Sequence, residues 1–536
     1  MSAPSDILAT HAVENQPDAR GDGDLWAGDP ALRDHIGDTA APAALGEVLG
    51  RAATRALGRA ANRHPPEAVV FDSGGRRLDE VQFHPAYHDL MALGLGSGYA
   101  SGPWTGGSHG AHAAMVYMFS QVEPGVCCPM TMTYAAVPTL ADKTDLCDRW
   151  RSRLTVAAYD PSVAPIGAKR AVTMGMVMTE KQGGSDLRAN STRAVPDGTG
   201  YRLTGHKWFC SAPMSDGFLT LAQAPGGLTC FLLPRWLEDG TRNGVHLMRL
   251  KDKLGNRANA SAEVEYHGAW AERLGDEGAG VRTIIEMVHH TRLDTAIAPA
   301  GLMRAALVEA HWWAAHRSAF QRRLIDQPLM RAVLADLALD WEGALALGLR
   351  VAQAFDGQGG PDRAFARVGV ALAKFLSNKR CVTVIAEAME ALGGMGYVED
   401  TPLPMFYREA PLNGIWEGAG NVICLDILRT LGREPLAGET LRAELDAAKG
   451  ADRRYDAAVA AHFDRWPDLP DAAEARWFVE SLACLLTASV LIRQAPQAVA
   501  DGYVATRVAG QRGMAAGTVA GLETEIILSR LGDGGA

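Results

Sequence analysis

The stretch M-T-E-K-Q-G-G-S-D-L-R-A-N, Met178–Asn190, lies at the end of a predicted strand and carries a turn of glycine and short polar residues. Gly183 and Gly184 permit tight backbone conformations, and Ser185 and Asp186 supply short polar groups directly after them. Such a loop can present backbone N–H groups and a hydroxyl to a ring edge or a phosphate. For this stretch alone, an ordinary Gly-Ser-Asp turn is the commoner explanation.

A second stretch, G-H-K-W-F-C-S-A-P at Gly205–Pro213, places two aromatic residues close to a small hydroxyl. Trp208 and Phe209 beside Ser211 would suit a flat, partly polar cofactor. A core strand whose aromatic side chains simply pack explains the same residues, and for this stretch alone it is the preferred explanation.

The third stretch, G-I-W-E-G-A-G-N-V-I-C-L-D-I-L-R at Gly414–Arg429, places Glu417 in a glycine-rich turn just before an apolar helix. Trp416 can shield the carboxylate from water, which would raise its pKa and make it a better base near neutral pH. Arg429 could offset that rise if it folds back toward Glu417. The alternative is a glutamate placed in the first turn of a helix by the helix dipole.

Around these stretches the chain divides into four regions by pattern. Residues 1–170 are Ala-rich and are expected to form helices joined by Gly/Pro-rich loops, while residues 171–276 hold short apolar runs separated by turns, which suggests a compact barrel or sandwich. Helical periodicity returns in residues 277–435, where one stripe consists of Leu329, Val333, Leu337, Trp341, Leu345 and Leu349. Residues 436–536 are expected to form an additional helical module.

Bulk composition limits the classes of function. The 536 residues carry a net charge of −10, which gives no global attraction to nucleic acid or to anionic membranes. The eight cysteines lack C-x-x-C spacing, and His109, His112, His289 and His290 lack further ligands at metal spacing, so we expect no metal site. The first 20 residues lack a basic start and an apolar run, and the tail's longest uncharged apolar stretch, Ser481–Ile492, is too short to span a bilayer, so a cytoplasmic location is expected.

At these motifs the sequence resembles the acyl-CoA dehydrogenase superfamily and, within it, the AidB branch linked to the adaptive response to alkylation. The resemblance rests on M-T-E-K-Q-G-G-S-D at Met178, R-L-K-D-K-L-G-N-R at Arg249 and I-W-E-G-x-G-N at Ile415. Shorter matches are F-H-P-A at Phe83, M-T-M-T at Met130, A-M-E-A-L-G-G-M-G-Y at Ala388 and Y-R-E at Tyr407.

The resemblance implies an α+β, mainly α fold with an N-terminal helical domain, a middle β-barrel and a C-terminal four-helix bundle, plus the extra helical module. It also implies FAD as cofactor, with Glu417 in the position of the catalytic base. Arg317 and Phe320 resemble residues that reach the FAD of a neighbouring subunit, so a homo-oligomer, a tetramer, is expected. The residues expected at the cofactor are Met178, Thr179, Gly184, Ser185, Phe209, Cys210, Ser211, Ile415, Trp416, Gly418, Gly420 and Asn421.

The expected reaction is removal of a proton alpha to a thioester carbonyl, with transfer of the beta hydride to FAD. Two alternatives stay open at this point. One is a DNA-associated flavoprotein that protects or repairs alkylated DNA, although residues 441–536 hold 10 basic against 13 acidic side chains, a balance that weakens this proposal. The other is a catalytically idle FAD-bound scaffold. The acyl group and the electron acceptor are not given by the sequence.

Overall fold

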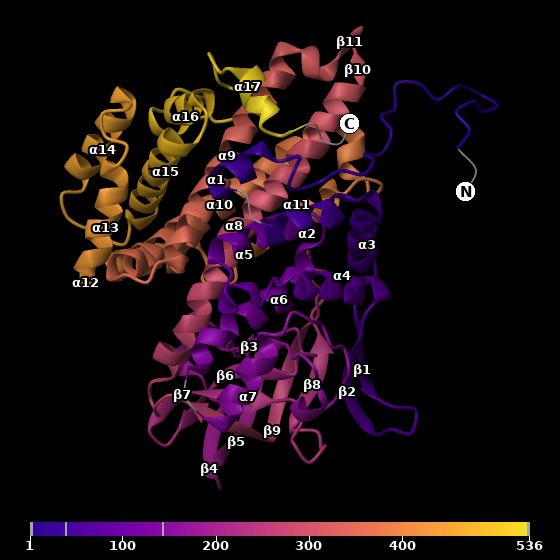
Figure 1. Ribbon diagram of the computed structural model, residues 1–536, viewed down its shortest axis with the longest axis vertical. Coiled ribbons are helices and arrows are strands. Elements are labelled where there is room, and N and C mark those ends of the chain that lie inside the picture. The colour runs from indigo at the N-terminus through magenta and orange to yellow at the C-terminus, as the bar shows by residue number, and fades with distance from the viewer. Residues whose placement is uncertain (1–3, 38–39, 142–143, 533–536) are drawn as a thin grey trace.

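The computed structural model describes residues 4–37, 40–141 and 144–532. A β-barrel forms one end of the molecule, long helices rise from it, and the last helices pack against the side of those long helices (Figure 1). The expected order of helices, barrel and helices is confirmed.

The described residues of the N-terminal part form seven α-helices and one β-hairpin. The helices are α1 (Pro30–Ile36), α2 (Ala40–Gly50), α3 (Ala52–Arg63), α4 (Pro85–Gly96), α5 (His109–Ser120), α6 (Pro124–Ala136) and α7 (Asp145–Leu154). The expectation of helices alone in this region was wrong, because β1 (Glu67–Phe71) pairs antiparallel with β2 (Arg77–Gln82). The turn between them is closed by Asp72, whose carboxylate accepts hydrogen bonds from the N–H groups of Gly74 and Arg76, both at 2.8 Å.

The middle region forms a seven-stranded sheet, five strands of which close into a barrel. Its strands are β3 (Met174–Val177), β4 (Arg193–Asp197), β5 (Gly200–Ser211), β6 (Gly217–Ala224), β7 (Gly227–Pro234), β8 (Val245–Leu250) and β9 (Ser261–Leu274). The sheet order β6-β4-β5-β9-β7 closes because β7 also pairs with β6. The six apolar runs of the sequence correspond to strands, whereas β4 was missed because it is mostly exposed and contains Pro196.

Long helices form the bundle above the barrel. They are α8 (Gly280–His316), α9 (Pro328–Asp356) and α10 (Gly360–Ala391), followed by the shorter α11 (Leu403–Glu409) and α12 (Gly420–Arg433). The predicted stripe lies on α9 and is buried from Leu337 onward, but Leu329 is 75% exposed because it lies in the first turn of α9. A small hairpin, β10 (Ser318–Ala319) and β11 (Arg322–Arg323), joins α8 to α9.

The C-terminal module packs on the bundle through buried contacts. It comprises α13 (Pro435–Asp446), α14 (Arg453–Arg465), α15 (Ala475–Gln494), α16 (Gln497–Tyr503) and α17 (Thr524–Ser529). A Cβ atom on Gly343 of α9 would lie 2.8 Å from the ring of Tyr503, so the module and the bundle approach closely here. By length and composition α15 could cross a membrane, yet most of it is buried inside the protein, which is also typical of a core helix.

Candidate active site

Glu417 lies in a strained backbone conformation. Its φ is +56°, in the left-handed region, and the next residue, Gly418, has φ +101°. The loop runs from the 3-10 turn Leu412–Gly414 to the start of α12 at Gly420. A non-glycine residue in this region costs on the order of 1–2 kcal/mol and persists only where surrounding contacts hold it. The strain is therefore an observation that points to function at this loop.

The Glu417 carboxylate is partly buried and has a specific partner on α8. Thr291 Oγ1 donates a hydrogen bond of 2.8 Å to Glu417 Oε2. Burial raises the pKa of Glu417 above its ordinary value, and the Thr291 hydrogen bond and the charges of Arg292 and Lys374 oppose that rise. A carboxylate with a raised pKa is better suited to accept a proton near neutral pH.

The arginine beside Glu417 is Arg292 of α8 and not Arg429. Arg429 is 57% exposed, and its Nη1 lies 3.8 Å from Asp426 Oδ1, so the suggestion that it folds back to offset the pKa of Glu417 was wrong. Arg292 Nε donates to the backbone oxygen of Glu417 at 3.2 Å, and Arg292 Nη1 donates to Asp426 Oδ2 at 2.8 Å. Arg292 therefore links the base loop to α12.

Trp416, which precedes Glu417 in this loop, is fixed by a hydrogen bond to a nearby side chain. Its Nε1 donates a 2.6 Å hydrogen bond to Asn413 Oδ1 across the turn. Trp416 is partly buried, whereas Ile415 is 63% exposed. At the start of α12, the Asn421 side-chain oxygen accepts a 2.9 Å hydrogen bond from Arg476 Nη1 of α15, so the C-terminal module contacts the base loop directly.

The Met178–Ser185 stretch lies beside β5. Trp208 N donates to Thr179 O at 2.8 Å, which pairs the end of the first motif with the second. A Cβ atom on Gly184 would lie 2.4 Å from Thr179 Oγ1, so only glycine lets the loop fold back over Thr179. Met178 and Thr179 are partly buried while Ser185 is exposed, so the loop leaves a hydroxyl at the surface.

Glu180, within the same motif, has a structural role that the sequence did not indicate. Its carboxylate lies 2.9 Å from Lys207 Nζ, and neither side chain is exposed. Ser191 and Thr192 add four hydrogen bonds through their N–H and hydroxyl groups. Burial alone would raise the pKa of Glu180, but the Lys207 charge and these hydrogen bonds outweigh it and lower the pKa to about 2. This network anchors the Met178–Ser185 loop to the barrel.

Residues 209–211 at the end of β5 alternate between two environments. Phe209 is 47% exposed, and the Lys251 Nζ lies 4.8 Å from its ring centroid. Cys210 is buried in the barrel core, which leaves only its backbone for contact with a cofactor. Ser211 is partly exposed on the same face as Phe209. An aromatic face and a hydroxyl are therefore available side by side.

The second and third motifs converge on Cys128 of α6. Burial raises the pKa of the Cys128 thiol to about 12; the Glu417 charge raises it further, while the Lys253 charge and the Ser211 hydroxyl lower it. Ser211 of the second motif and Glu417 of the third motif therefore both influence the pKa of one buried thiol of α6. No spacing in the sequence singled out Cys128.

The residue types in the three motifs fit a flavin. Thr179, Ser185 and Ser211 offer hydroxyls, Asn421 offers an amide, and the half-exposed Phe209 offers an aromatic face. This donor set suits the polar edge and flat face of an isoalloxazine.

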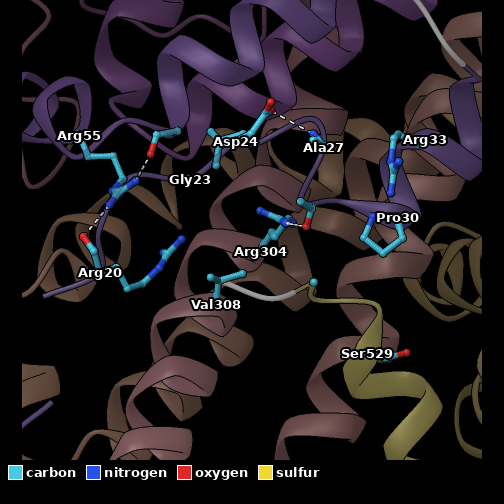
Figure 2. Close-up of a pocket in the computed structure, with 14 residues that line it drawn as sticks. Arg20, Gly23, Asp24, Ala27, Pro30, Arg33, Arg55, Arg304, Val308 and Ser529 are labelled. Carbon is cyan, nitrogen blue, oxygen red and sulfur yellow. Dashed lines mark hydrogen bonds between the residues drawn. The ribbon is translucent and has the colours of Figure 1, made fainter. Parts of the chain in front are cut away.

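A separate cavity of about 330 Å³ lies between the N-terminal segment, α8 and the end of the chain (Figure 2). It is lined by Arg20, Arg33, Arg55 and Arg304, with Asp24 as its one acidic side chain. Arg304 and Arg20 are ion-paired at 2.7 Å with Asp29 and Glu309. None of the predicted site residues lines this cavity. The described residues also contain no group of three or more His, Cys, Asp or Glu side chains placed to hold a metal ion.

Three family descriptions match consecutive parts of the chain. They are the adaptive response protein AidB N-terminal domain at residues 15–161, the acyl-CoA dehydrogenase middle domain at residues 175–269 and the acyl-CoA dehydrogenase C-terminal domain at residues 278–432. The base loop lies in the third of these and the Met178–Ser185 and β5 motifs lie in the second.

Relatives of known sequence and structure agree with this assignment. The chain is 46% identical to the putative acyl-CoA dehydrogenase AidB of Escherichia coli over 464 residues, which covers 84% of this chain and 86% of that protein. It is similar in structure to Caenorhabditis elegans ACDH-11, solved in complex with C11-CoA, with a TM-score of 0.84, 28% identity and coverage of 94% and 93%. Butyryl-CoA dehydrogenase from Megasphaera elsdenii, at 19% identity and TM-score 0.61 over 75% of this chain and 98% of that chain, shares the fold.

The chain belongs to the acyl-CoA dehydrogenase family. Its N-terminal match and its similarity to the Escherichia coli protein place it in the AidB-like branch. It is accordingly an FAD-dependent oxidoreductase of the acyl-CoA dehydrogenase type.

Proposed function

We propose that Glu417 is the base that removes the proton alpha to the carbonyl of an acyl thioester. The observation that carries this proposal is the left-handed Glu417, fixed by Thr291 and Arg292, with a pKa raised by burial. FAD, when bound, supplies the acceptor for the hydride that leaves the beta carbon. The electron pair of the broken alpha C–H bond becomes the new C=C bond, and the Glu417 carboxylate takes the proton.

The other residues position and shield this reaction. Thr291 orients the carboxylate, and Trp416 limits the access of water to it. We assign Ser211 and Phe209 to the flavin side of the substrate, opposite Glu417. A positioned base contributes typically 10²- to 10⁴-fold in rate, or roughly 3 to 5 kcal/mol of barrier.

Anaerobic titration of the FAD-loaded protein with acyl-CoA thioesters tests the proposal. Butyryl-, isobutyryl-, octanoyl- and undecanoyl-CoA are suitable probes, since the ACDH-11 structure contains C11-CoA, whereas the bulk of Trp416 favours shorter chains in this protein. We expect bleaching of the flavin absorbance by at least one thioester, and no bleaching in Glu417→Gln, which retains FAD. Full bleaching of Glu417→Gln would remove the assignment of the base.

We also propose that the functional form is a cytoplasmic homotetramer in which the hairpin between α8 and α9 reaches a neighbouring subunit. Phe320 at its tip is 86% exposed with φ +53°, as expected of a side chain kept for a partner. Light scattering would give the mass. A monomer at working concentration would exclude this arrangement.

The DNA-associated alternative has less support. Arginines on the surface of the C-terminal module are neutralised by nearby carboxylates, as in the pairs Arg465–Glu474 at 3.1 Å and Arg493–Glu444 at 2.8 Å. Because affinity for DNA comes largely from neutralising phosphates, paired arginines contribute little. A gel-shift with duplex DNA at low salt, in which we expect no shift, tests this alternative.

A further inference from the structure

A buried lysine lies behind the loop that carries Glu417. Lys374 projects from α10 and is 2% exposed. Its Nζ donates to the backbone oxygen of Asn413 at 2.7 Å and to that of Gly418 at 3.0 Å. These two carbonyl groups flank the strained residue, so a single ammonium group ties the two ends of the base loop together.

Lys374 differs from the other buried lysines among the described residues. Lys169 lies 2.6 Å from the carboxylate of Asp216, and Lys207 lies 2.9 Å from that of Glu180. The described part of the chain gives Lys374 no such ion pair, and its partners are the two carbonyl oxygens. Burying an ammonium group without a carboxylate partner costs free energy of folding. Its retention behind the base loop therefore indicates a function of Lys374 at that loop.

We infer that Lys374 is a positioning residue for the base: its ammonium group holds the backbone on both sides of Glu417 and favours the ionised form of that carboxylate. This inference rests on the proposed function of Glu417. A misplacement of about 1 Å in a catalytic group can cost about 10²-fold in rate. Holding the loop at both ends therefore favours catalysis enough to offset the cost of burying the ammonium group.

The electrostatics agree with the geometry. Burial lowers the pKa of Lys374 to about 7; the Glu417 charge opposes this, and Arg292 and Lys379 lower it further. The charge of Lys374 in turn lowers the pKa of Glu417, and so does that of Arg292. The Cys128 thiol on α6 also feels the Glu417 charge. The ionisation of the base is thus coupled to a lysine that itself titrates near neutral pH.

Two substitutions separate the holding role from the charge. Lys374→Met removes both the donors and the charge, whereas Lys374→Gln removes the charge and keeps two N–H donors on a side chain that is one atom shorter. The measurement is the rate of flavin reduction by the best acyl-CoA in anaerobic stopped-flow, as a function of pH. We expect flavin reduction in Lys374→Met to be slower by up to about 10²-fold. We also expect the acidic limb of its pH–rate profile, where Glu417 becomes protonated, to move to higher pH. We expect Lys374→Gln to regain most of the limiting rate while keeping the moved limb.

Lys169→Met is the matched control, because it removes an equally buried lysine that contacts Asp216 and not the base loop. It should lower the unfolding midpoint and leave the acidic limb in place. Hydrogen–deuterium exchange of amides 413–420 in the FAD-loaded proteins gives a second readout that does not depend on turnover. Exchange should be faster in Lys374→Met and unchanged in Lys169→Met.

The inference would be overturned if both Lys374 variants showed the wild-type pH–rate profile and the wild-type exchange rate of amides 413–420. If Lys374→Met does not fold, Lys374→Gln alone decides through the position of the limb. Glu417→Gln, run in parallel, keeps the two claims apart. Full flavin reduction in Glu417→Gln would remove the base itself, whereas its loss beside unaltered Lys374 variants would remove only the role of Lys374.

Discussion

Replacement of Lys207 by methionine tests how the Met178–Ser185 loop is anchored. The Lys207 ammonium donates to Glu180 Oε1 at 2.9 Å and to the Leu221 carbonyl at 2.8 Å, with its side chain fully buried. The variant leaves the Glu180 carboxylate buried with its Ser191, Thr192 and Gln182 partners but without a counter-charge. Breaking one half of a buried ion pair costs about 3–5 kcal/mol, because the remaining charge has no compensation.

We therefore expect Lys207→Met to lower the free energy of unfolding by about 3–5 kcal/mol, with weaker retention of FAD. Urea unfolding followed by circular dichroism measures the first quantity, and the ratio of flavin to protein absorbance after gel filtration measures the second. Lys449→Met, at an exposed position of the C-terminal module, is the control and should change the free energy of unfolding by less than about 0.5 kcal/mol. A loss below about 1 kcal/mol in Lys207→Met would refute the reasoning that this pair anchors the loop.

Three further predictions follow from the packing and charge of the protein. Gly184→Ala should lose FAD while keeping the fold, because its Cβ would lie 2.4 Å from Thr179 Oγ1. Gly438→Ala is the control, since that residue lies in open space on a helix, and it should keep FAD. The flavin content after purification measures both. Burial lowers the pKa of Lys374 to about 7 from its ordinary 10.5, so between these pH values the unfolded chain binds more protons than the folded protein. The free energy of unfolding of the wild type should therefore rise from pH 7 to pH 10 relative to that of Lys374→Gln. An equal pH dependence of the unfolding free energy in both proteins would contradict this. Arg507→Met should destabilise the protein by about 3–5 kcal/mol, because Arg507 Nη2 donates to the buried Asp340 of α9 at 2.9 Å. The C-terminal module should then be cut faster by protease, and a wild-type digestion pattern would argue against this docking contact.

The sequence predicted those elements whose pattern follows from burial on one face. The part of the α9 stripe from Leu337 onward, which repeats every four residues, and the apolar runs of the barrel are examples, since period and burial coincide there. The start of α12 after a glycine-rich turn was also predictable. By contrast, β4 and β1 are largely exposed, so their sequences carry little periodicity from which a strand could be inferred.

The surroundings of the base could not be predicted from local sequence. Thr291 and Arg292, which hold Glu417, lie 126 and 125 residues before it, and Lys374 lies 44 residues before the Gly418 carbonyl that it binds. Only the packing of α8 and α10 against the loop brings these side chains together. The nearer Arg429 looked suitable by spacing, yet its place on α12 directs it toward Asp426.

The most direct measurement compares an acyl-CoA with its alpha-dideuterated form in anaerobic flavin reduction by the wild-type protein and by Glu417→Gln. If the Glu417 carboxylate removes the alpha proton, deuterium slows the wild-type reaction and Glu417→Gln shows no reduction with either form. Equal rates for the two forms in the wild type, together with undiminished reduction in Glu417→Gln, would contradict the role assigned to this residue.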